Sequence, residues 1–334
     1  MTMREVAVLG AGSWGTALAV HLARTGHAVR LWGRDPELLA AMRDVRLNVA
    51  YLPDVVLPET VVVTGDAAAA VDGAACVVVA APTHGVRAVV RDAAPRMADG
   101  AAVVSAVKGL EQDTLYRVSQ ILEQECPPGV RVAVLSGPSF ARDLARELPT
   151  AVSVASHDEA TAASVQEEFK APYFRLYATT DVVGVEMGGA LKNVVAIAAG
   201  VTEGLGLGES ARAALITRGL AEIGRLACAM GARRETMAGL SGLGDLVLTC
   251  GGALSRNRRV GVELGRGRPI AEVLEGMRMV AEGVRTTEAA LALAVRHGVE
   301  LPIAAQVAAL LEGRTDARAA LEELMLRPQR TEAG

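Results

Sequence analysis

The chain lacks the features that mark secreted, metal-binding and membrane proteins. Its four cysteines are far apart and form no Cys-x-x-Cys pair, so we expect neither a disulfide framework nor a zinc or other metal site. The first apolar stretch carries a glycine turn, which argues against a signal peptide. No apolar run reaches membrane-spanning length without a charge, since Glu186 and Lys192 interrupt the longest candidate. We therefore expect a cytoplasmic protein with no stable membrane insertion.

An excess of charge of one sign is also missing. The net charge of −4 gives no general attraction to nucleic acid or anionic membranes, so we expect a small-molecule partner and no nucleic acid. The apolar fraction of 51% and the charged fraction of 22% are typical of a globular chain. A length of 334 residues exceeds one ordinary core and predicts two domains. The sequence does not fix the oligomeric state, and a homodimer stays open.

The most informative segment that is present is Val-Ala-Val-Leu-Gly-Ala-Gly-Ser-Trp-Gly at residues 6–15. It is a short apolar strand running into Gly-x-Gly-x-x-Gly, and an apolar helix pattern follows at once. Gly10 permits the tight turn, Gly12 lets the backbone approach a pyrophosphate, and Gly15 lets the helix pack against the strand. The start of the helix offers free N–H groups to an anion. The segment predicts dinucleotide binding; the alternative is a glycine-rich turn without a ligand.

The ribose end of this site carries two opposing signals. The next strand is predicted at residues 28–32 and is followed by Gly33, Arg34 and Asp35. An acidic residue here favours NAD, because it accepts from the ribose 2′-OH, whereas an arginine favours NADP by pairing with the 2′-phosphate. Arg34 could equally be a solvated loop arginine. We favour NADP as an accepted cofactor, with NAD still allowed.

The order of predicted elements indicates an α/β protein with a helical second half. Up to residue 180, short valine- and alanine-rich runs alternate with helical patterns, which predicts a mostly parallel, doubly wound Rossmann-type sheet over a dinucleotide-binding domain of residues 1–180. The predicted strands are 4–9, 28–32, 60–64, 76–80, 101–106, 131–135, 150–155 and 173–177. An all-helical substrate and catalytic domain is expected at 181–334. Its predicted helices are 182–203, 209–230, 233–240, 255–265, 269–276, 285–297 and 303–312.

Lys192 is the main candidate for catalysis. It lies within a helix pattern that is apolar nearly all round, so we expect it to be buried and its pKa to fall toward neutrality. Such a lysine is suited to moving a proton on and off a carbonyl or hydroxyl oxygen. The alternative is a lysine at a helix edge, paired with Glu186 or Glu203. Gly188 and Gly189 favour a functional role, because glycines inside a helix indicate the close approach of another group.

Two further segments carry polar residues in apolar surroundings. Asp245 lies in the glycine-rich stretch 239–246 and is either a helix N-cap, a partner that orients Lys192, or an acceptor for a substrate hydroxyl. Ser-Arg-Asn-Arg-Arg at 255–259 opens a predicted helix, where a phosphate or carboxylate would bind well. The alternative for that segment is a basic turn facing solvent.

Loops at the ends of predicted strands supply the remaining candidates. Lys108 follows one strand and could place a positive charge over substrate and cofactor. Gly137 and Ser139 offer backbone N–H and hydroxyl donors after another. His84 also lies in such a loop, but loop histidines beside cofactor sites are as often structural, and we assign it no role. The common placement at strand ends is the argument, because ligands of open α/β sheets bind there.

Taken together, these segments resemble the bacterial-type NAD(P)-dependent glycerol-3-phosphate dehydrogenase family over nearly the whole chain. The matching segments are Gly-Ala-Gly-Ser-Trp-Gly at 10–15, Lys-Gly-Leu-Glu at 108–111, Gly-Pro-Ser-Phe-Ala at 137–141, Leu-Lys-Asn-Val-Val-Ala-Ile-Ala-Ala-Gly at 191–200, Gly-Leu-Gly-Asp-Leu at 242–246, Ser-Arg-Asn-Arg-Arg at 255–259 and Glu-Gly-Val at 282–284. Each is a modest signal, but all of them in order are highly specific.

The resemblance implies reversible hydride transfer from NAD(P)H to dihydroxyacetone phosphate, giving sn-glycerol 3-phosphate for glycerophospholipid synthesis, with Lys192 as the proton donor and acceptor. The implied substrate-binding residues are Lys108, Gly137, Ser139, Lys192, Asp245, Ser255, Arg256 and Asn257. Besides the three glycines, the implied cofactor-binding residues are Ser13, Trp14, Arg34, Lys108, Ala141, Arg256, Val280 and Glu282.

Two positions depart from the family pattern. Val107 stands where the family often has threonine, and Gly33 stands where a basic residue is sometimes found, which leaves the preference for NADP resting on Arg34. Two other functions were weighed. One is a related dehydrogenase for a β-hydroxy acid or sugar acid, and the other is a non-catalytic, nicotinamide-binding redox sensor. The sensor would leave Lys192, Asp245 and the arginine cluster without a role.

Overall fold

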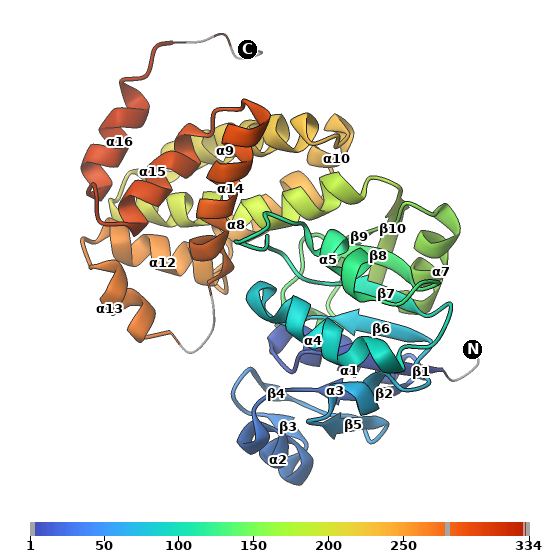
Figure 1. Ribbon diagram of the computed structural model, residues 1–334. Helices are drawn as coiled ribbons and strands as arrows, with labels where there is room; N and C mark the ends of the chain where they lie inside the picture. The colour runs from blue at the N-terminus through green and yellow to red at the C-terminus, as the bar shows by residue number, and fades with distance from the viewer. Residues whose placement is uncertain (1–3, 278–280, 330, 332–334) are drawn as a thin grey trace.

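The computed structural model describes residues 4–277, 281–329 and 331 of the chain. The N-terminal half forms a sheet with helices on both faces, and the C-terminal half is helical and packs along one long central helix (Figure 1). This arrangement confirms the predicted fold class.

The sheet has eight strands in the order β10-β9-β8-β7-β6-β1-β2-β5. They are β1 (Glu5–Leu9), β2 (Ala28–Trp32), β5 (Val61–Thr64), β6 (Cys76–Val79), β7 (Ala102–Ser105), β8 (Arg131–Ser136), β9 (Thr150–Ala155) and β10 (Phe174–Thr179). The strands from β5 to β8 are parallel; β9 runs antiparallel to β8, and β10 runs parallel to β9. Successive connections diverge between β1 and β6, and a crevice for ligands forms at the carboxyl ends of strands at such a point.

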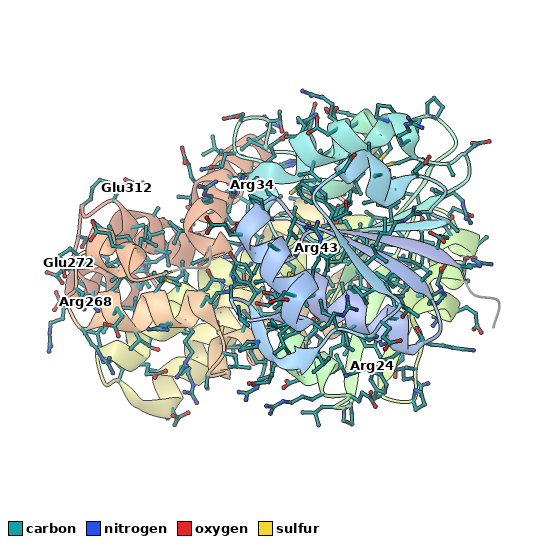
Figure 2. All side chains as sticks on the ribbon, turned by 90° about the horizontal axis from the view of Figure 1, so that it is seen from below. Arg24, Arg34, Arg43, Arg268, Glu272 and Glu312 are labelled. Atoms are coloured by element: carbon teal, nitrogen blue, oxygen red, sulfur yellow. The ribbon has the colours of Figure 1, made fainter. Side chains whose placement is uncertain are left out.

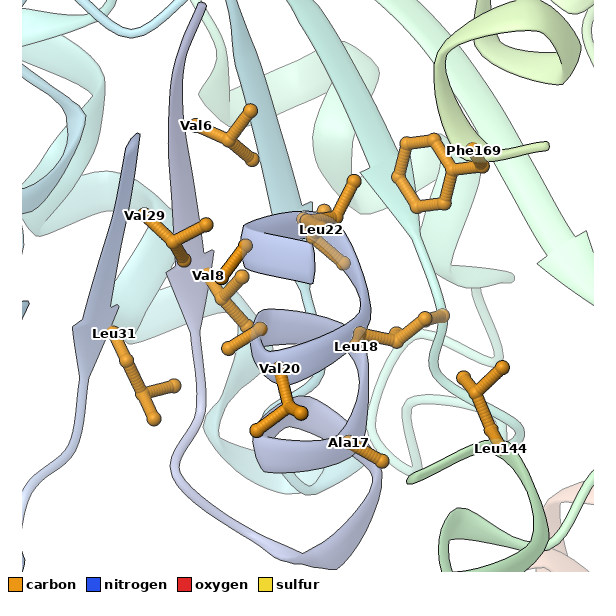
Figure 3. Packing of buried hydrophobic residues seen from close by; sticks show 14 of the residues in the cluster. Val6, Val8, Ala17, Leu18, Val20, Leu22, Val29, Leu31, Leu144 and Phe169 are labelled. Carbon is orange, nitrogen blue, oxygen red and sulfur yellow. The ribbon is translucent and has the colours of Figure 1, made fainter. Parts of the chain in front are cut away.

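The central strands β1, β6 and β7 are buried on both faces, which explains their apolar runs. On one face, Val6 and Val8 pack against Leu18 and Leu22 of α1 (Ser13–Arg24), as Figure 3 shows. The same core includes residues of α6 (Ala141–Ala145) and α7 (Glu159–Phe169). The opposite face is covered by α3 (Ala67–Val71), α4 (Val86–Ala93) and α5 (Val118–Glu125).

Several small elements between β2 and β7 were not predicted from the sequence. They are α2 (Pro36–Val45), the two-stranded sheet of β3 (Leu47–Asn48) and β4 (Leu52–Val56), and the short 3-10 helices η1 (Thr83–Gly85) and η2 (Ala94–Arg96). They are additional to the predicted strands, and β3 and β4 form a separate two-stranded sheet.

The helical half is built around α8 (Val182–Gly204). The helices around it are α9 (Gly208–Ala229), α10 (Arg234–Met237), α11 (Asp245–Gly251), α12 (Arg256–Gly265), α13 (Ile270–Glu275), α14 (Glu282–His297), α15 (Pro302–Leu311) and α16 (Ala317–Met325). Although α8 has the length and hydropathy of a membrane-spanning helix, 94% of its most apolar window is buried inside the protein. Its apolar side chains therefore contact other parts of the chain.

Glycines set the closest helix crossing. A side chain at Gly200 of α8 would overlap the backbone of α12, and one at Gly261 of α12 would overlap the backbone of α8. Only glycine allows the two helices to approach at backbone distance. The crossing fixes where the amino end of α12 lies relative to α8.

The change of architecture falls between Thr179, where β10 ends, and Val182, where α8 begins. Asp181 caps α8 by accepting from the Gly184 N–H at 2.9 Å, and we propose the domain boundary here. The predicted helix at 233–240 is wrong in its second half, because α10 ends at Met237 and the backbone of Gly239 is extended. A π-helical turn, η3 (Leu240–Gly244), leads from there into α11.

Candidate active site

A buried lysine and a buried aspartate form the centre of the site. Lys192 of α8 is 6% exposed and Asp245, the first residue of α11, is 0% exposed. The Lys192 ammonium donates to Asp245 Oδ1 and, at 2.8 Å, to Thr249 Oγ1. The cap position of α11 is Gly244, and no side chain caps that helix end. Of the three alternatives for Asp245, the structure therefore shows the partner of Lys192, and the N-cap is wrong.

The structure also rules out the helix-edge pairing of Lys192. Glu186 accepts instead from the backbone N–H of Ser119 at 2.7 Å, from its hydroxyl at 2.6 Å, and from Arg117. Glu203 accepts from Arg258 through two hydrogen bonds of 2.8 and 2.7 Å. Neither glutamate is the partner of Lys192, so the alternative based on them is wrong.

Lys108 reaches the same aspartate from the other half of the protein. Its ammonium donates to Asp245 Oδ2 at 2.7 Å, to the Gly137 carbonyl at 2.8 Å and, more weakly, to Ser139 Oγ at 3.5 Å. Gly137 has a φ of +150°, a backbone conformation that favours glycine. The structure thus brings together five of the predicted substrate-site residues, with one ammonium on each oxygen of a single carboxylate.

Burial controls the proton affinity of this cluster. Desolvation lowers the pKa of Lys192 to about 7, while the negative charge of Asp245 opposes the shift and the positive charge of Lys108 adds to it. Two of the three ammonium N–H groups of Lys192 are used by Asp245 and Thr249. Within the described part of the chain the third has no acceptor. Two cations around one anion leave net positive charge, which favours a negatively charged oxygen nearby.

The glycines beside Lys192 are explained by contacts within the protein. A side chain at Gly188 would lie 2.5 Å from the Ser241 carbonyl oxygen, and one at Gly189 would overlap Ser136 Oγ. The predicted close approach is confirmed, but the approaching groups belong to η3, the π-helical turn before α11, and to the end of β8. Together these glycines let α8 sit against both halves of the protein at the position of Lys192.

The predicted anion site lies at the start of α12. Ser255 caps this helix, its Oγ accepting from the Arg258 N–H at 3.2 Å. Arg256 is exposed, yet the protein around it lowers the pKa of its guanidinium, against the opposing effect of Glu282. An anion at the amino end of α12 would meet both this guanidinium and the positive end of the helix dipole.

Asn257 points inward and links three helices. Its Nδ2 donates to Asn193 Oδ1 at 2.9 Å, and its Oδ1 accepts from the Gly283 N–H at 2.9 Å. Asn193 in turn donates to the Lys108 carbonyl at 3.3 Å. The chain of amides connects the start of α12 and the start of α14 to the loop that carries Lys108. Direct substrate contact by Asn257 stays a prediction.

The glycine turn fits a dinucleotide. Gly10 has a φ of +133°, and a side chain there would lie 2.6 Å from the Ala80 backbone. A side chain at Gly15 would overlap the Gly10 carbonyl oxygen, so packing within the protein requires both glycines. A side chain at Gly12, by contrast, would meet no atom within 4 Å. The open space at Gly12 lies at the amino end of α1, where a pyrophosphate would bind.

The structure distinguishes the two residues at the ribose end, Asp35 and Arg34, whose side chains favour different cofactors. Asp35 caps α2 and accepts from the N–H groups of Glu37 and Leu38 at 3.0 and 3.2 Å. Arg34 is exposed, and Figure 2 labels it where the sheet half borders the helical half. Burial is the main cause of the lowered pKa of the His84 imidazole; the positive charges of Arg285 and Arg34 lower it further, whereas the negative charge of Glu282 opposes the shift. Asp35 is therefore engaged in helix capping, whereas the neighbouring Arg34 is an exposed side chain.

The other predicted cofactor residues lie at helix starts. Ser13 and Trp14 open α1, and Ala141 opens α6. Glu282 opens α14 and accepts from the Thr83 N–H at 3.2 Å, which links α14 to the loop after β6. Val280 lies outside the described residues.

Comparison with known proteins identifies the family. Residues 5–162 match the family model of the NAD-dependent glycerol-3-phosphate dehydrogenase N-terminus, and residues 181–322 match that of its C-terminus. The chain belongs to the NAD-dependent glycerol-3-phosphate dehydrogenase family. It is 53% identical over 330 residues to glycerol-3-phosphate dehydrogenase [NAD(P)+] of Geobacter sp. (strain M21), covering 98% of both chains. It is 52% identical to that of Koribacter versatilis, covering 99% of both.

A solved structure agrees with this assignment. The crystal structure of glycerol-3-phosphate dehydrogenase from Coxiella burnetii superposes with a TM-score of 0.93 at 40% identity and covers 97% of this chain and 99% of that one. The predicted resemblance to the glycerol-3-phosphate dehydrogenases is confirmed, as is NAD or NADP as the cofactor.

Two polar residues of this dehydrogenase site were not predicted from the sequence. Thr249 accepts from Lys192, and its hydroxyl is oriented because it donates to the Asp245 carbonyl at 2.6 Å. The sequence feature that could have indicated Thr249 is its position four residues after Asp245, which places both side chains on one face of a helix. Asn193 directly follows Lys192, but only the tertiary structure shows that it contacts the Lys108 loop.

Proposed function

We propose that the chain catalyses the reversible reduction of dihydroxyacetone phosphate to sn-glycerol 3-phosphate with NADPH or NADH. The observation that carries the proposal is the buried Lys192 ammonium, held by Asp245 with one N–H still available, in a chain of this dehydrogenase family. The product is the phosphorylated glycerol unit from which glycerophospholipids are built.

Lys192 acts on the oxygen of the reacting carbon. When bound along Gly12, Ser13, Trp14 and Arg34, the cofactor supplies the hydride. The Lys192 ammonium donates its third N–H to the carbonyl oxygen of the substrate and gives up that proton as negative charge develops there. In the oxidative direction the neutral amine takes the proton back. A pKa of about 7 suits both directions near neutral pH.

Lys108 and Asp245 support that transfer. Lys108 adds a second positive charge beside the developing oxyanion, and donors fixed in advance in this way contribute several kcal/mol. Asp245 holds both ammonium groups in place. Gly137 and Ser139 fix Lys108 from the other side and line the substrate end of the loop after β8.

The start of α12 holds the phosphate in this proposal. Ser255 and Arg256 provide the helix terminus and a guanidinium, and Asn257 fixes that terminus against α8 and α14. Binding energy from the remote phosphate helps orient the carbonyl between cofactor and lysine. Ala141 and Glu282 complete the proposed cofactor contacts.

The decisive assay follows the absorbance of NADPH and NADH with dihydroxyacetone phosphate, beside a β-keto acid and a keto-sugar acid at equal concentration. Oxidation with dihydroxyacetone phosphate alone supports the proposal. Preferential turnover of an acid contradicts it, and cofactor binding without oxidation by any carbonyl compound would point to a sensor. Arg34→Gln separates the cofactors: we expect it to weaken NADPH more than NADH.

For location and assembly, we propose a cytoplasmic enzyme whose partners are its small-molecule substrate and cofactor, with no nucleic-acid or membrane partner. The four cysteines are free thiols, which fits a reducing compartment, and the net charge is −4. A homodimer is the oligomeric state proposed, and light scattering of the purified chain at several concentrations tests it.

A further inference from the structure

The loop that carries Lys108 has little regular structure of its own. It covers residues 106–117, between the end of β7 and the start of α5, and within it only Leu110 and Arg117 form an isolated β-bridge. Long loops of this kind keep one conformation only where tertiary contacts fix them. Lys108 nevertheless needs a defined position, because its ammonium contacts Asp245 and Gly137 at the same time.

This loop packs tightly against the neighbouring loop after β6. A side chain at Gly109 would overlap Thr83 Oγ1 and lie 3.3 Å from Glu282 Oε2. The N–H of Thr83 donates to the same glutamate. The two loops and the start of α14 therefore meet within one residue of Lys108.

A two-point ion pair ties the Lys108 loop to helix α4 on the other side of Gly109. Arg87, in the first turn of α4, donates through Nε to Glu111 Oε1 at 2.8 Å and through Nη2 to Glu111 Oε2 at 2.7 Å. Its remaining nitrogen donates to Gln124 at 2.9 Å and Glu125 at 2.6 Å, near the end of α5. An arginine that uses its whole fork in this way fixes orientation as well as distance.

We propose that Arg87 and Glu111 are positioning residues that hold Lys108 against Asp245. The proposal rests on the role proposed above for Lys108. Glu111 lies three residues after Lys108 and is the first charged anchor beyond it, while Asn193 holds the Lys108 carbonyl. With Glu111 released, the segment 108–111 keeps its contact to α8 but loses its contact to α4.

The pair stays ionised over the working pH range. Arg87, followed by the Thr114 hydroxyl, lowers the pKa of Glu111, and the hydrogen bonds to Glu111 and Glu125 raise the pKa of Arg87. Both side chains are partly shielded from water, at 22% and 15% exposed. Loosening of this anchor by protonation is therefore not expected near neutral pH.

The test compares Glu111→Gln and Arg87→Gln with Arg91→Gln as the matched control. Arg91 belongs to the same ion network and the same helix, but it pairs with Glu125 alone and does not touch the loop. We expect a loss of about ten- to a hundredfold in kcat/KM for dihydroxyacetone phosphate in the first two variants, because small displacements of a catalytic group cost this much. Cofactor affinity and the control variant stay near wild type.

Two further readouts separate positioning from mere stability. Because Lys108 lowers the pKa of Lys192, displacing it shifts the pH limb of kcat to higher pH in Glu111→Gln, as in Lys108→Met. The double variant loses no more activity than Arg87→Gln alone, since both substitutions break the Arg87–Glu111 contact. If Glu111→Gln does not fold, Arg87→Lys tests the same point, because lysine keeps the charge but not the two-point contact.

The outcomes distinguish this inference from the proposed function. Glu111→Gln with wild-type kcat/KM and an unmoved pH limb overturns the positioning role. Lys108→Met with wild-type turnover overturns the role of Lys108 itself. A low-activity Lys108→Met beside a fully active Glu111→Gln would leave the function intact and reject the positioning alone.

Discussion

Replacing Thr249 by valine removes one acceptor from the Lys192 ammonium and keeps the shape of the side chain. Thr249 is buried, and its hydroxyl accepts from Lys192 at 2.8 Å. A hydrogen bond to a charged group is worth about 1.5–3 kcal/mol. One pH unit corresponds to about 1.36 kcal/mol, so the pKa of Lys192 is expected to fall by about one to two units below its value of about 7.

The direction of the pKa shift of Lys192 depends on which of its protonation states loses the hydrogen bond to Thr249. The hydroxyl oxygen is already oriented by its bond to the Asp245 carbonyl, so it stabilises the ammonium and not the amine. In the reductive direction, which needs the ammonium, activity of Thr249→Val is lost at lower pH than in wild type. In the oxidative direction, which needs the amine, activity is gained at lower pH.

The assay is the pH dependence of kcat in both directions at saturating substrate and cofactor. Thr249→Ser keeps the hydroxyl and serves as the control, with its limbs expected near the wild-type position. A folded Thr249→Val enzyme whose limbs stay in place, or move to higher pH, would refute the assignment of this titration to Lys192.

The remaining predictions concern the glycine turn and a buried carboxyl. We expect Gly12→Val to weaken cofactor binding, measured by calorimetry, and to leave the temperature of thermal unfolding nearly unchanged. We expect Gly15→Ala to lower the unfolding temperature, because a side chain there overlaps the Gly10 carbonyl. Tight cofactor binding by Gly12→Val would contradict a cofactor site in the open space at that residue. Burial raises the pKa of Glu222 to about 7. The free energy of unfolding therefore falls by up to about 3 kcal/mol as the pH rises from about 4.5 to about 7, because the folded state resists ionisation of this carboxyl. Above that pH, Glu222 causes no further change in stability. We expect the free energy of unfolding of Glu222→Gln to decline less than that of wild type over this pH range. Parallel curves for the two proteins would contradict the raised pKa of Glu222.

The strands of the sheet could be predicted because the pattern that marks each strand lies within a few consecutive residues. Every predicted strand appears within two residues of its predicted ends, since each strand is a short run rich in apolar residues and bounded by turns. The turn at Gly10 and Gly15 was also predictable, because packing between β1 and α1 demands glycine there. The helix starting at Asp245 was missed, because glycines surround it and a π-helical turn, which no periodicity announces, precedes it.

The site was predictable in its residue types but not in its pairings. Lys192 was expected to be buried from the apolar helix around it, and it is. Nothing in the chain order indicated that Lys108 would share the carboxylate of Asp245, since the two lie 137 residues apart. Likewise, the choice between Glu186, Glu203 and Asp245 as the partner of Lys192 depends on the crossing of α8 with α11, which only the folded chain shows.

The most direct test of the account is single-turnover reduction of dihydroxyacetone phosphate by the Lys192→Met variant loaded with NADPH. Methionine fills the same volume without a proton to give, and general acid catalysis contributes roughly 10²- to 10⁴-fold. We expect turnover to fall by about 10³-fold while NADPH binds as in wild type. A folded variant that binds NADPH and turns over within about tenfold of wild type would contradict the central role of Lys192.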